Sequence, residues 1–238
     1  MDQLLIALDV ETGEQAVGLA DALRGAAGGF KIGSRLFTAE GPSLVRALTG
    51  RGDRVFLDLK YHDIPNTVAT AVTAAAALGV WMVNVHASGG TRMMQAARDA
   101  AREGAARAGH PTPLVIAVTV LTSMNAGSLA ETGISDPVLD QVVRLSTLAQ
   151  SAGLDGVVAS PQETAIIRRA CGPDFVIVTP GIRGGGATTS GKDDQARTMT
   201  PAGAVRAGAS YIVVGRPIIA AADPRAAAEG IRWGAEGC

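Results

Sequence analysis

Residues 56–67 read FLDLKYHDIPNT, and this short stretch contains the end of one expected element and the start of the next. Residues 54–60 form an apolar run of the length and composition of a buried strand. Pro65 is typical of the first turn of a helix. Between the two elements the chain places opposite charges, with Asp58 and Lys60 at the tip of the strand. The stretch therefore predicts a strand–helix unit with polar chemistry at its junction.

The same alternation of short apolar runs and Ala-rich segments of helical period extends along the whole chain. We expect strands at 4–10, 29–33, 54–60, 81–88, 113–121, 155–160, 175–182 and 211–218. We expect helices at 14–26, 38–50, 64–79, 91–108, 137–153, 161–171, 200–208 and 223–235. Strands that are apolar on both faces and separated by helices predict a parallel sheet. Eight such units in 238 residues favour an α/β fold with a single (β/α)₈ TIM barrel spanning 1–238, rather than an open doubly wound sheet.

Bulk composition excludes several classes of protein. Hydrophobic residues make up 47% of the chain and mean hydropathy is +0.23, yet no apolar run approaches the ~20 residues of a membrane span. The first ten residues do not resemble a signal peptide, and Cys171 and Cys238 form no disulfide framework. A net charge of −1 gives no electrostatic footprint for nucleic acid or anionic lipid. We expect a cytoplasmic protein with no nucleic-acid or membrane partner.

Polar residues gather at one end of the expected strands. They are Asp9, Lys31, Asp58, Lys60, His86, Thr122, Ser123, Arg183 and Arg216. In a barrel the carboxyl ends of the strands converge on one face, where the loops build the active site. Polar residues also mark strand ends wherever a chain leaves the core, which is the alternative explanation for any one of them. Charged residues at nearly every strand end favour a site.

The charged residues of the opening stretch suit proton transfer. Asp58 and Lys60 are two positions apart on a strand and therefore point the same way, while Asp63 lies beyond the strand. An ammonium between two carboxylates stays protonated, so it can deliver a proton to a carbanion. An ion-pair network that stabilises a strand end is the alternative. Lys31, one strand away, is one of only three lysines among 21 basic residues, and this second scarce lysine favours a site.

A phosphate site is expected on the other side of the barrel. The segment TPGIRGGG follows the seventh expected strand, and VGRPI ends the eighth. Barrel phosphate sites commonly use these two loops. Gly215 permits close backbone approach, and Arg216 can donate two hydrogen bonds to phosphate oxygens. Gly215 alone could simply turn the chain, but Arg183 and Gln195 beside it favour phosphate binding.

Other motifs do not reach a functional assignment. GATTSGK at 186–192 has the spacing of a phosphate-loop NTPase, but Asp193 stands where a hydroxyl should hold magnesium. We therefore interpret 183–199 as a long loop of the kind that serves as a lid. The three histidines lack metal-ligand spacing, and no dinucleotide-binding fingerprint is present.

At this point a resemblance is clear. DLKYHDIPNT, at 58–67, resembles the signature of the orotidine 5′-phosphate decarboxylase family. The segments ALDV, FKIG, VTVLTSM, TPGIR, DQARTMTP and VGRPI match other segments of that family in order, along the whole chain. The departures are Tyr61, at a variable position of the signature, and a phosphate loop rich in Gly and Thr.

The resemblance implies a (β/α)₈ homodimer that converts orotidine 5′-phosphate to UMP and CO₂ without a metal or organic cofactor. It implies that Lys60 donates the proton to C6, that Asp58 lies next to the substrate carboxylate, and that Lys31 holds this array. Asp63 and Thr67 would reach across the dimer into the neighbouring subunit's site. The remaining substrate-binding residues that it implies are Asp9 for the ribose, Thr122 and Ser123 for the pyrimidine, Arg183, Gln195, Gly215 and Arg216 for the phosphate, and Pro180 without an assigned part of the substrate.

Two rival functions follow from the same residues. A magnesium-dependent decarboxylase or aldolase of the same superfamily would share the Asp-x-Lys-x-x-Asp core. It would carry an acidic metal-site residue where this chain has Lys31, and a cation there repels magnesium. A non-catalytic phosphate-binding barrel would have lost part of the catalytic array, whereas all four charges are present here.

Overall fold

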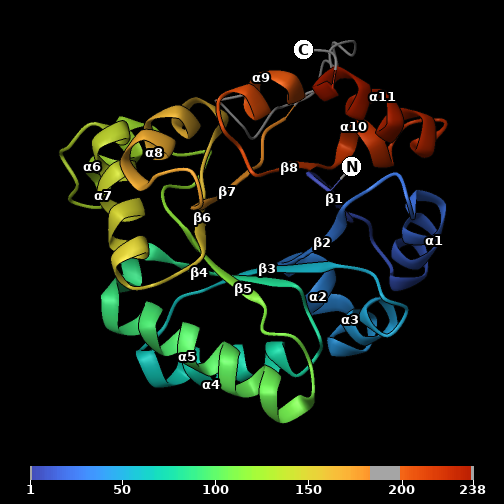
Figure 1. Cartoon of the computed structure of the whole chain (residues 1–238), viewed down its shortest axis with the longest axis horizontal. Coiled ribbons are helices and arrows are strands. Elements are labelled where there is room, and N and C mark those ends of the chain that lie inside the picture. Colours follow the sequence, from blue (N-terminus) through green and yellow to red (C-terminus); the bar gives the residue numbers. More distant parts are fainter. Residues whose placement is uncertain (1, 183–198, 237–238) are drawn as a thin grey trace.

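Eight parallel strands form a closed barrel in the order β1 to β8 in the computed structural model, which describes residues 2–182 and 199–236. The strands circle the centre of the molecule and the helices lie outside them (Figure 1). Their bounds are β1 Leu4–Ala7, β2 Gly29–Gly33, β3 Val55–Tyr61, β4 Met82–His86, β5 Leu114–Val118, β6 Gly156–Val158, β7 Val176–Thr179 and β8 Tyr211–Val214. The predicted TIM barrel is confirmed.

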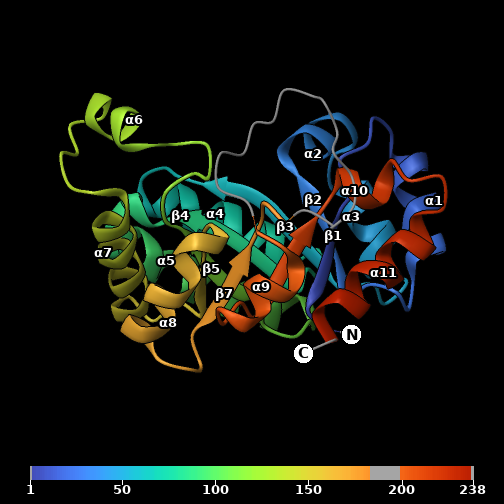
Figure 2. The same cartoon turned by 90° about the horizontal axis from the view of Figure 1, so that it is seen from above.

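Helices follow every strand, although β7 and α9 are separated by residues outside the described range. Their bounds are α1 Gly13–Leu23, α2 Ser34–Glu40, α3 Pro42–Thr49, α4 Pro65–Ala76, α5 Gly90–Ala108, α6 Ala126–Glu131, α7 Val138–Ser151, α8 Thr164–Cys171, α9 Pro201–Arg206, α10 Arg216–Ile219 and α11 Pro224–Glu236, with short 3₁₀ turns at Ala87–Gly89 and Pro161–Glu163. In Figure 2, α2 and α6 lie on the side of the barrel opposite to the chain termini. That side is the carboxyl end of the strands.

Several expected boundaries were wrong. The helix expected at 38–50 is two helices, because Gly41 adopts a φ of 67° between α2 and α3 and Pro42 then starts the second helix. The last strand stops at Val214; of the residues expected to continue it to 218, Gly215 precedes α10 and residues 216–218 lie within it. The short helix α6 was also not predicted, since its six residues lie in a polar loop with no helical period.

Side chains of the strands alternate between two cores. Leu5 and Phe56 belong to a small cluster inside the barrel, whereas Ile6 and Leu57 belong to the larger cluster between the strands and the helices. All four are at most 2% exposed. Burial on both faces is expected of a parallel sheet covered by helices, and it explains why the strands read as continuous apolar runs.

Arg168 on α8 fastens two turns at the amino end of the strands. Its guanidinium donates to the carbonyl oxygens of Gly172 at 2.8 Å, and of Pro173 and Phe175 at 2.7 Å each. It also donates to the carbonyl of Gly208 at 2.7 Å, in the turn before β8. One side chain therefore satisfies backbone acceptors on both sides of β7.

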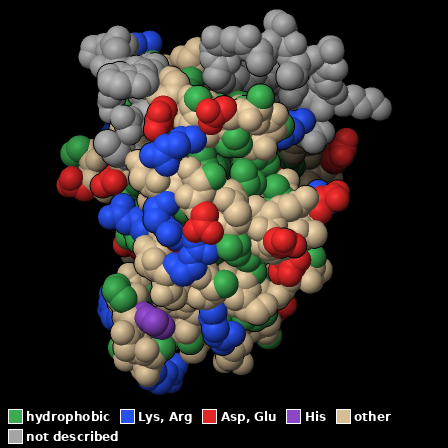
Figure 3. Space-filling view, turned by 90° about the vertical axis from the view of Figure 1, so that its right-hand side faces the viewer, with side chains coloured by type: hydrophobic (Ala, Val, Ile, Leu, Met, Phe, Trp, Pro, Cys, Tyr) green, Lys and Arg blue, Asp and Glu red, His purple; other side chains and the backbone are tan. Residues whose placement is uncertain are grey.

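The barrel closes by pairing β1 with β8, with Leu5 opposite Val213. Arg225 on α11 strengthens this closure by donating to the carbonyls of Ala22 and Arg24, at 3.1 and 3.2 Å. Positive and negative side chains are interspersed on the face seen in Figure 3. The surface ion pairs include Arg24 with Asp53 and Arg51 with Asp21. None of the described helices is both long enough and apolar enough to cross a membrane.

Candidate active site

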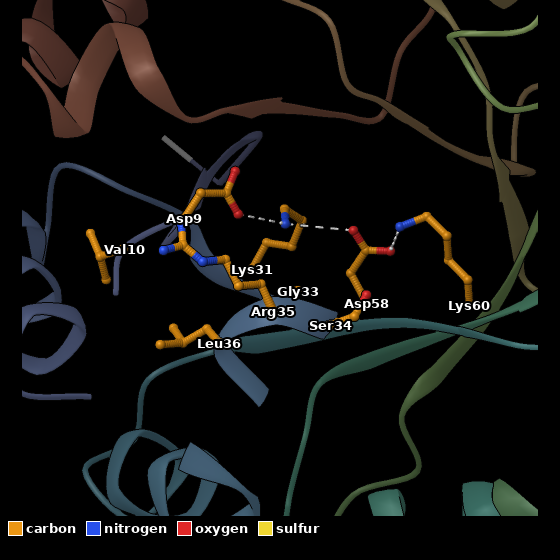
Figure 4. A pocket seen from close by; sticks show the side chains of 9 residues that line it. All are labelled: Asp9, Val10, Lys31, Gly33, Ser34, Arg35, Leu36, Asp58 and Lys60. Atoms are coloured by element: carbon orange, nitrogen blue, oxygen red, sulfur yellow. Dashed lines mark hydrogen bonds and ion pairs between the residues drawn. The ribbon is translucent and has the colours of Figure 1, made fainter. Parts of the chain in front are cut away.

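Four charged side chains of alternating sign form a row at the carboxyl ends of the first three strands (Figure 4). Lys31 Nζ lies 3.2 Å from Asp9 Oδ1 and 3.6 Å from Asp58 Oδ2. Lys60 Nζ lies 2.7 Å from Asp58 Oδ1. All four line one cavity of about 260 Å³. The structure thus brings together residues that the sequence placed on three different strands.

Asp58 is the centre of this row. Its side chain is 13% exposed and that of Lys31 is 12% exposed, whereas Lys60 is 34% exposed and faces the cavity. Burial by itself raises the pKa of the Asp58 carboxyl. The charges of Lys31 and Lys60, with hydrogen bonds from Lys60 and Asn84, outweigh burial and hold that pKa below its ordinary value. Asp58 is therefore a carboxylate between two cations.

The backbone at Lys60 departs from a regular strand. Lys60 has a φ of 53°, and among the described residues no other non-glycine residue has a positive φ. The pairing of β3 with β4 shifts at this point, from Leu57 opposite Val83 to Tyr61 opposite Val85. The prediction that the side chains of Asp58 and Lys60 lie together is confirmed. The reason given for it, regular strand alternation, was wrong. They meet through a bulge.

Asn84 is a site residue that the sequence reasoning missed. Its side chain is completely buried on β4, donates from Nδ2 to Asp58 Oδ1 at 2.7 Å and accepts the Lys60 backbone N–H at 2.8 Å. A signal was available, because asparagine is unfavourable in a strand and interrupts the apolar run of WMVNVHAS. Its partners could not be found without knowing which strand lies beside it.

Two histidines stack next to the charged row. The rings of His62 and His86 lie 5.3 Å apart at an angle of 30°. Burial lowers the pKa of His86, and the nearby charges of His62 and Lys60 act in the same direction against a smaller opposing effect of Asp58. The pKa of the His86 imidazole is therefore lower than its ordinary value.

Asp63 and Thr67 lie outside this cavity. Both side chains are exposed, and Asp63 Oδ1 accepts the backbone N–H of Ile64 at 2.6 Å. Ile64 itself is 67% exposed, which is unusual for a large apolar residue in this chain. Within a single chain the alternating row is completed by Asp9 rather than by Asp63.

The remaining predicted binding residues surround the same face. Thr122 is half-buried and Ser123 exposed in the loop between β5 and α6, and half-buried Pro180 follows β7. Gly215 follows β8 and lies against Asp9, since a Cβ placed on it would be 3.3 Å from Asp9 Oδ2. This close approach is a steric reason for glycine at position 215, in addition to the turn of the chain there.

The phosphate side is only partly described. Arg216 is exposed at the start of α10. Arg183 and Gln195, with most of the expected lid at 183–199, lie outside the described residues. Within the described part of the chain no group of three or more His, Cys, Asp or Glu side chains could hold a metal ion. The described row offers a proton-bearing cation, a fixed carboxylate and space for a small molecule.

Comparison with known proteins gives consistent results. The model of the family described as "Orotidine 5′-phosphate decarboxylase / HUMPS family" matches residues 2–231. The chain is 56% identical to orotidine 5′-phosphate decarboxylase of Moorella thermoacetica, over 97% of this chain and 90% of that protein. It is 53% identical to the enzyme of the same name from Syntrophotalea carbinolica, over 96% and 93%. The crystal structure of orotidine 5′-phosphate decarboxylase from Lactobacillus acidophilus superposes with a TM-score of 0.87 at 38% identity, covering 99% of each chain.

Proposed function

We propose, since this chain belongs to the orotidine 5′-phosphate decarboxylase / HUMPS family, that it decarboxylates orotidine 5′-phosphate to UMP in de novo pyrimidine biosynthesis. The observation that carries this proposal is the row in which Asp58 lies between the ammonium groups of Lys31 and Lys60. A fixed cation beside a carboxylate in a small cavity is suited to loss of CO₂ followed by protonation of carbon.

The proposed chemistry uses side chains alone, with no metal or organic cofactor. The bond between C6 and the substrate carboxylate breaks, CO₂ leaves, and the electron pair remains on C6 in an orbital with no conjugated sink. The Lys60 ammonium stabilises that pair electrostatically and then transfers its proton to C6. Lys60 regains a proton from solvent after the product leaves. Asp58 lies where it would face the leaving carboxylate, and Lys31 holds Asp58 in place.

The row cannot supply all of the required acceleration. Each ~1.4 kcal/mol removed from the barrier gives a tenfold rate increase, and so slow a reaction needs on the order of 20 kcal/mol. We propose that binding of the distant phosphate contributes by closing the 183–199 loop over the substrate. Within the charged row, Asp9 and Lys31 are also proposed substrate contacts. The proposed contacts beyond the row are Thr67, Thr122, Ser123, Pro180, Arg183, Gln195, Gly215 and Arg216.

The proposal includes a homodimer. Asp63 and Thr67 are exposed beside a 67% exposed isoleucine, and they lie next to the strand that carries Lys60. An exposed apolar residue next to polar ones supports a protein–protein contact at this point. We propose that Asp63 and Thr67 of one chain complete the site of the other.

The proposal also covers the whole chain and its location. We propose that residues 1–238 act as one catalytic domain. A phosphorylated nucleotide is charged and does not cross a lipid bilayer unaided, so an enzyme that acts on it is expected where that nucleotide is made. This supports a cytoplasmic location.

A direct test uses metal-free protein. The protein is treated with EDTA and mixed with orotidine 5′-phosphate, and loss of the orotate chromophore is followed by ultraviolet absorbance. We expect turnover that does not change when magnesium is added back. Absence of turnover, with activity on a sugar phosphate that magnesium restores, would move the chain to the metal-dependent function.

The magnesium-dependent alternative is disfavoured by one described contact. The Lys31 ammonium lies 3.2 Å from Asp9 and 3.6 Å from Asp58, between the two carboxylates that a divalent cation would need as ligands here. An ammonium at this distance from both carboxylates offsets their negative charge and repels a magnesium ion.

A further inference from the structure

The Lys60 backbone is held by a side chain instead of by its neighbouring strand. Between the pairs Leu57–Val83 and Tyr61–Val85, residues 58–60 of β3 lie opposite the single residue Asn84 of β4. A regular ladder would give the Lys60 N–H a carbonyl partner. Here Asn84 Oδ1 accepts that N–H at 2.8 Å. The carboxamide therefore replaces a missing ladder bond within the bulge.

The other end of the same carboxamide holds the carboxylate. Asn84 Nδ2 donates to Asp58 Oδ1 at 2.7 Å, and Lys60 Nζ donates to the same oxygen at 2.7 Å. A backbone N–H can only donate and a carboxylate can only accept, so the two partners together fix which way the amide points. Only a side chain with a donor and an acceptor two bonds apart satisfies both.

The conformation that this amide holds is strained. A lysine with a φ of 53° is in the left-handed region, which side chains other than glycine, asparagine and aspartate rarely adopt. Strained residues of this kind persist only where their surroundings hold them, and they concentrate at active sites. The strain at Lys60 coincides with the residue that would transfer the proton.

We propose that Asn84 is a positioning residue for the reaction, because its buried carboxamide holds Lys60 in the bulge and Asp58 in register, and so aims the Lys60 ammonium into the cavity. This inference rests on the proposed decarboxylase function for its kinetic consequences. Its structural consequence, the link between Asn84 and Asp58, stands apart from the substrate. The lowered pKa of Asp58, to which the Asn84 hydrogen bond contributes after burial and the two lysines, is consistent with it.

The test compares Asn84→Leu and Asn84→Asp with the wild-type protein. Leucine keeps the volume of the side chain and removes both hydrogen bonds. We expect kcat for orotidine 5′-phosphate to fall about 100-fold, because a small displacement of a reacting group has effects of this size. Affinity for UMP should change little, since Asn84 is not expected to touch the nucleotide.

Asn84→Asp gives a readout that a purely structural role would not move. A protonated aspartic acid can donate to Asp58 and accept the Lys60 N–H, as the amide does, whereas an ionised one repels Asp58. The titratable groups around the position are Lys31 on β2, Asp58 and Lys60 on β3, and the stacked pair His62 and His86. The kcat of this variant relative to wild type should therefore rise as pH falls.

Ser146→Ala is the matched control. Ser146 is also completely buried, and its hydroxyl donates to the Val142 carbonyl at 2.8 Å within α7, away from the cavity. This variant loses a buried hydrogen bond and should keep the wild-type kcat and pH profile. Circular dichroism and urea unfolding of all three variants distinguish loss of the fold from misplacement of the Lys60 ammonium in a folded protein.

A ¹³C NMR titration of the Asp58 carboxyl supplies a readout without substrate. We expect the pKa of Asp58 to be higher in Asn84→Leu than in wild type. Wild-type kcat in both Asn84 variants, or an unchanged Asp58 titration, would overturn the inference. A wild-type protein that does not act on orotidine 5′-phosphate would overturn the proposed function instead, and the titration would still decide the role of Asn84.

Discussion

The ammonium of Lys60 lies 2.7 Å from Asp58 Oδ1, while Lys31 approaches the other oxygen of the same carboxylate at 3.6 Å. Each oxygen of Asp58 therefore faces a different cation. Lys60 is the more exposed of the two lysines, and it lines the cavity.

Replacing Lys60 with alanine should separate catalysis from binding. We expect kcat of Lys60→Ala to fall by at least about 10³-fold, because the proposed proton donor and its positive charge are both lost. The dissociation constant for UMP should change less than about tenfold, since most of the proposed nucleotide contacts are made by other residues. Stopped assays with long incubation measure the first quantity and isothermal titration calorimetry the second. Turnover near the wild-type value would rule out Lys60 as the donor.

Replacing Arg216 should weaken binding of the phosphate group and leave binding of the nucleoside unchanged. Arg216→Ala is expected to weaken UMP binding by about 10- to 100-fold, the usual effect of removing a hydrogen bond between charged groups. Binding of uridine, which lacks the phosphate, should be the same in both proteins. Calorimetry with the two ligands makes this comparison. Equal losses for uridine and UMP would show that Arg216 supports the fold of the site and does not bind phosphate.

The dimer can be tested by mixing two inactive chains. Lys60→Ala and Asp63→Ala should each be severely impaired alone. If Asp63 serves the neighbouring site, a mixed dimer has one intact site, and random pairing recovers about a quarter of wild-type activity. Co-expression with two different affinity tags isolates the mixed dimer. No recovery in that isolated dimer would place Asp63 in the site of its own chain.

The Asp58 carboxylate should make stability depend on pH in acid. Its pKa in the folded chain is lower than its ordinary value of 3.8, so the unfolded chain takes up a proton first as pH falls. The stabilisation is fully present above the ordinary pKa and is lost as pH falls through the folded pKa. Urea unfolding of wild type and Asp58→Asn between neutral pH and pH 3 measures this. Relative to Asp58→Asn, wild type should lose unfolding free energy only in the acid part of the range. A difference that does not change with pH would contradict the lowered pKa of Asp58.

Arg168 should matter for stability and not for catalysis. Arg168→Met keeps the apolar stem but removes the donors to four carbonyl oxygens, so we expect a loss of about 3 kcal/mol in unfolding free energy. Arg169→Met is the matched control, because the next residue is exposed. Urea midpoints measure the effect. An equal shift of the urea midpoint in both variants would show that the hydrogen bonds from Arg168 to the four carbonyls do not contribute specifically to stability.

Much of the fold could be predicted because its signal is local. Apolar runs separated by helical segments identify eight strand–helix units, and the scarcity of lysine singled out Lys31 and Lys60. The bulge at Lys60 could not be predicted, since it depends on the register between β3 and β4 and on Asn84, 24 residues further along the chain. The split at Gly41 was in principle visible, because Gly-Pro marks a break in a helix.

Because the first strand pairs with the last, the barrel cannot close until the end of synthesis. While β8 is still inside the ribosome, Leu5 has no neighbour on one side, and β1 is an open edge. The strands that carry the charged row are complete long before the barrel can close. A nascent chain therefore carries most of its catalytic charges on a sheet with an unpaired edge, which makes late synthesis the interval in which it is most prone to aggregate.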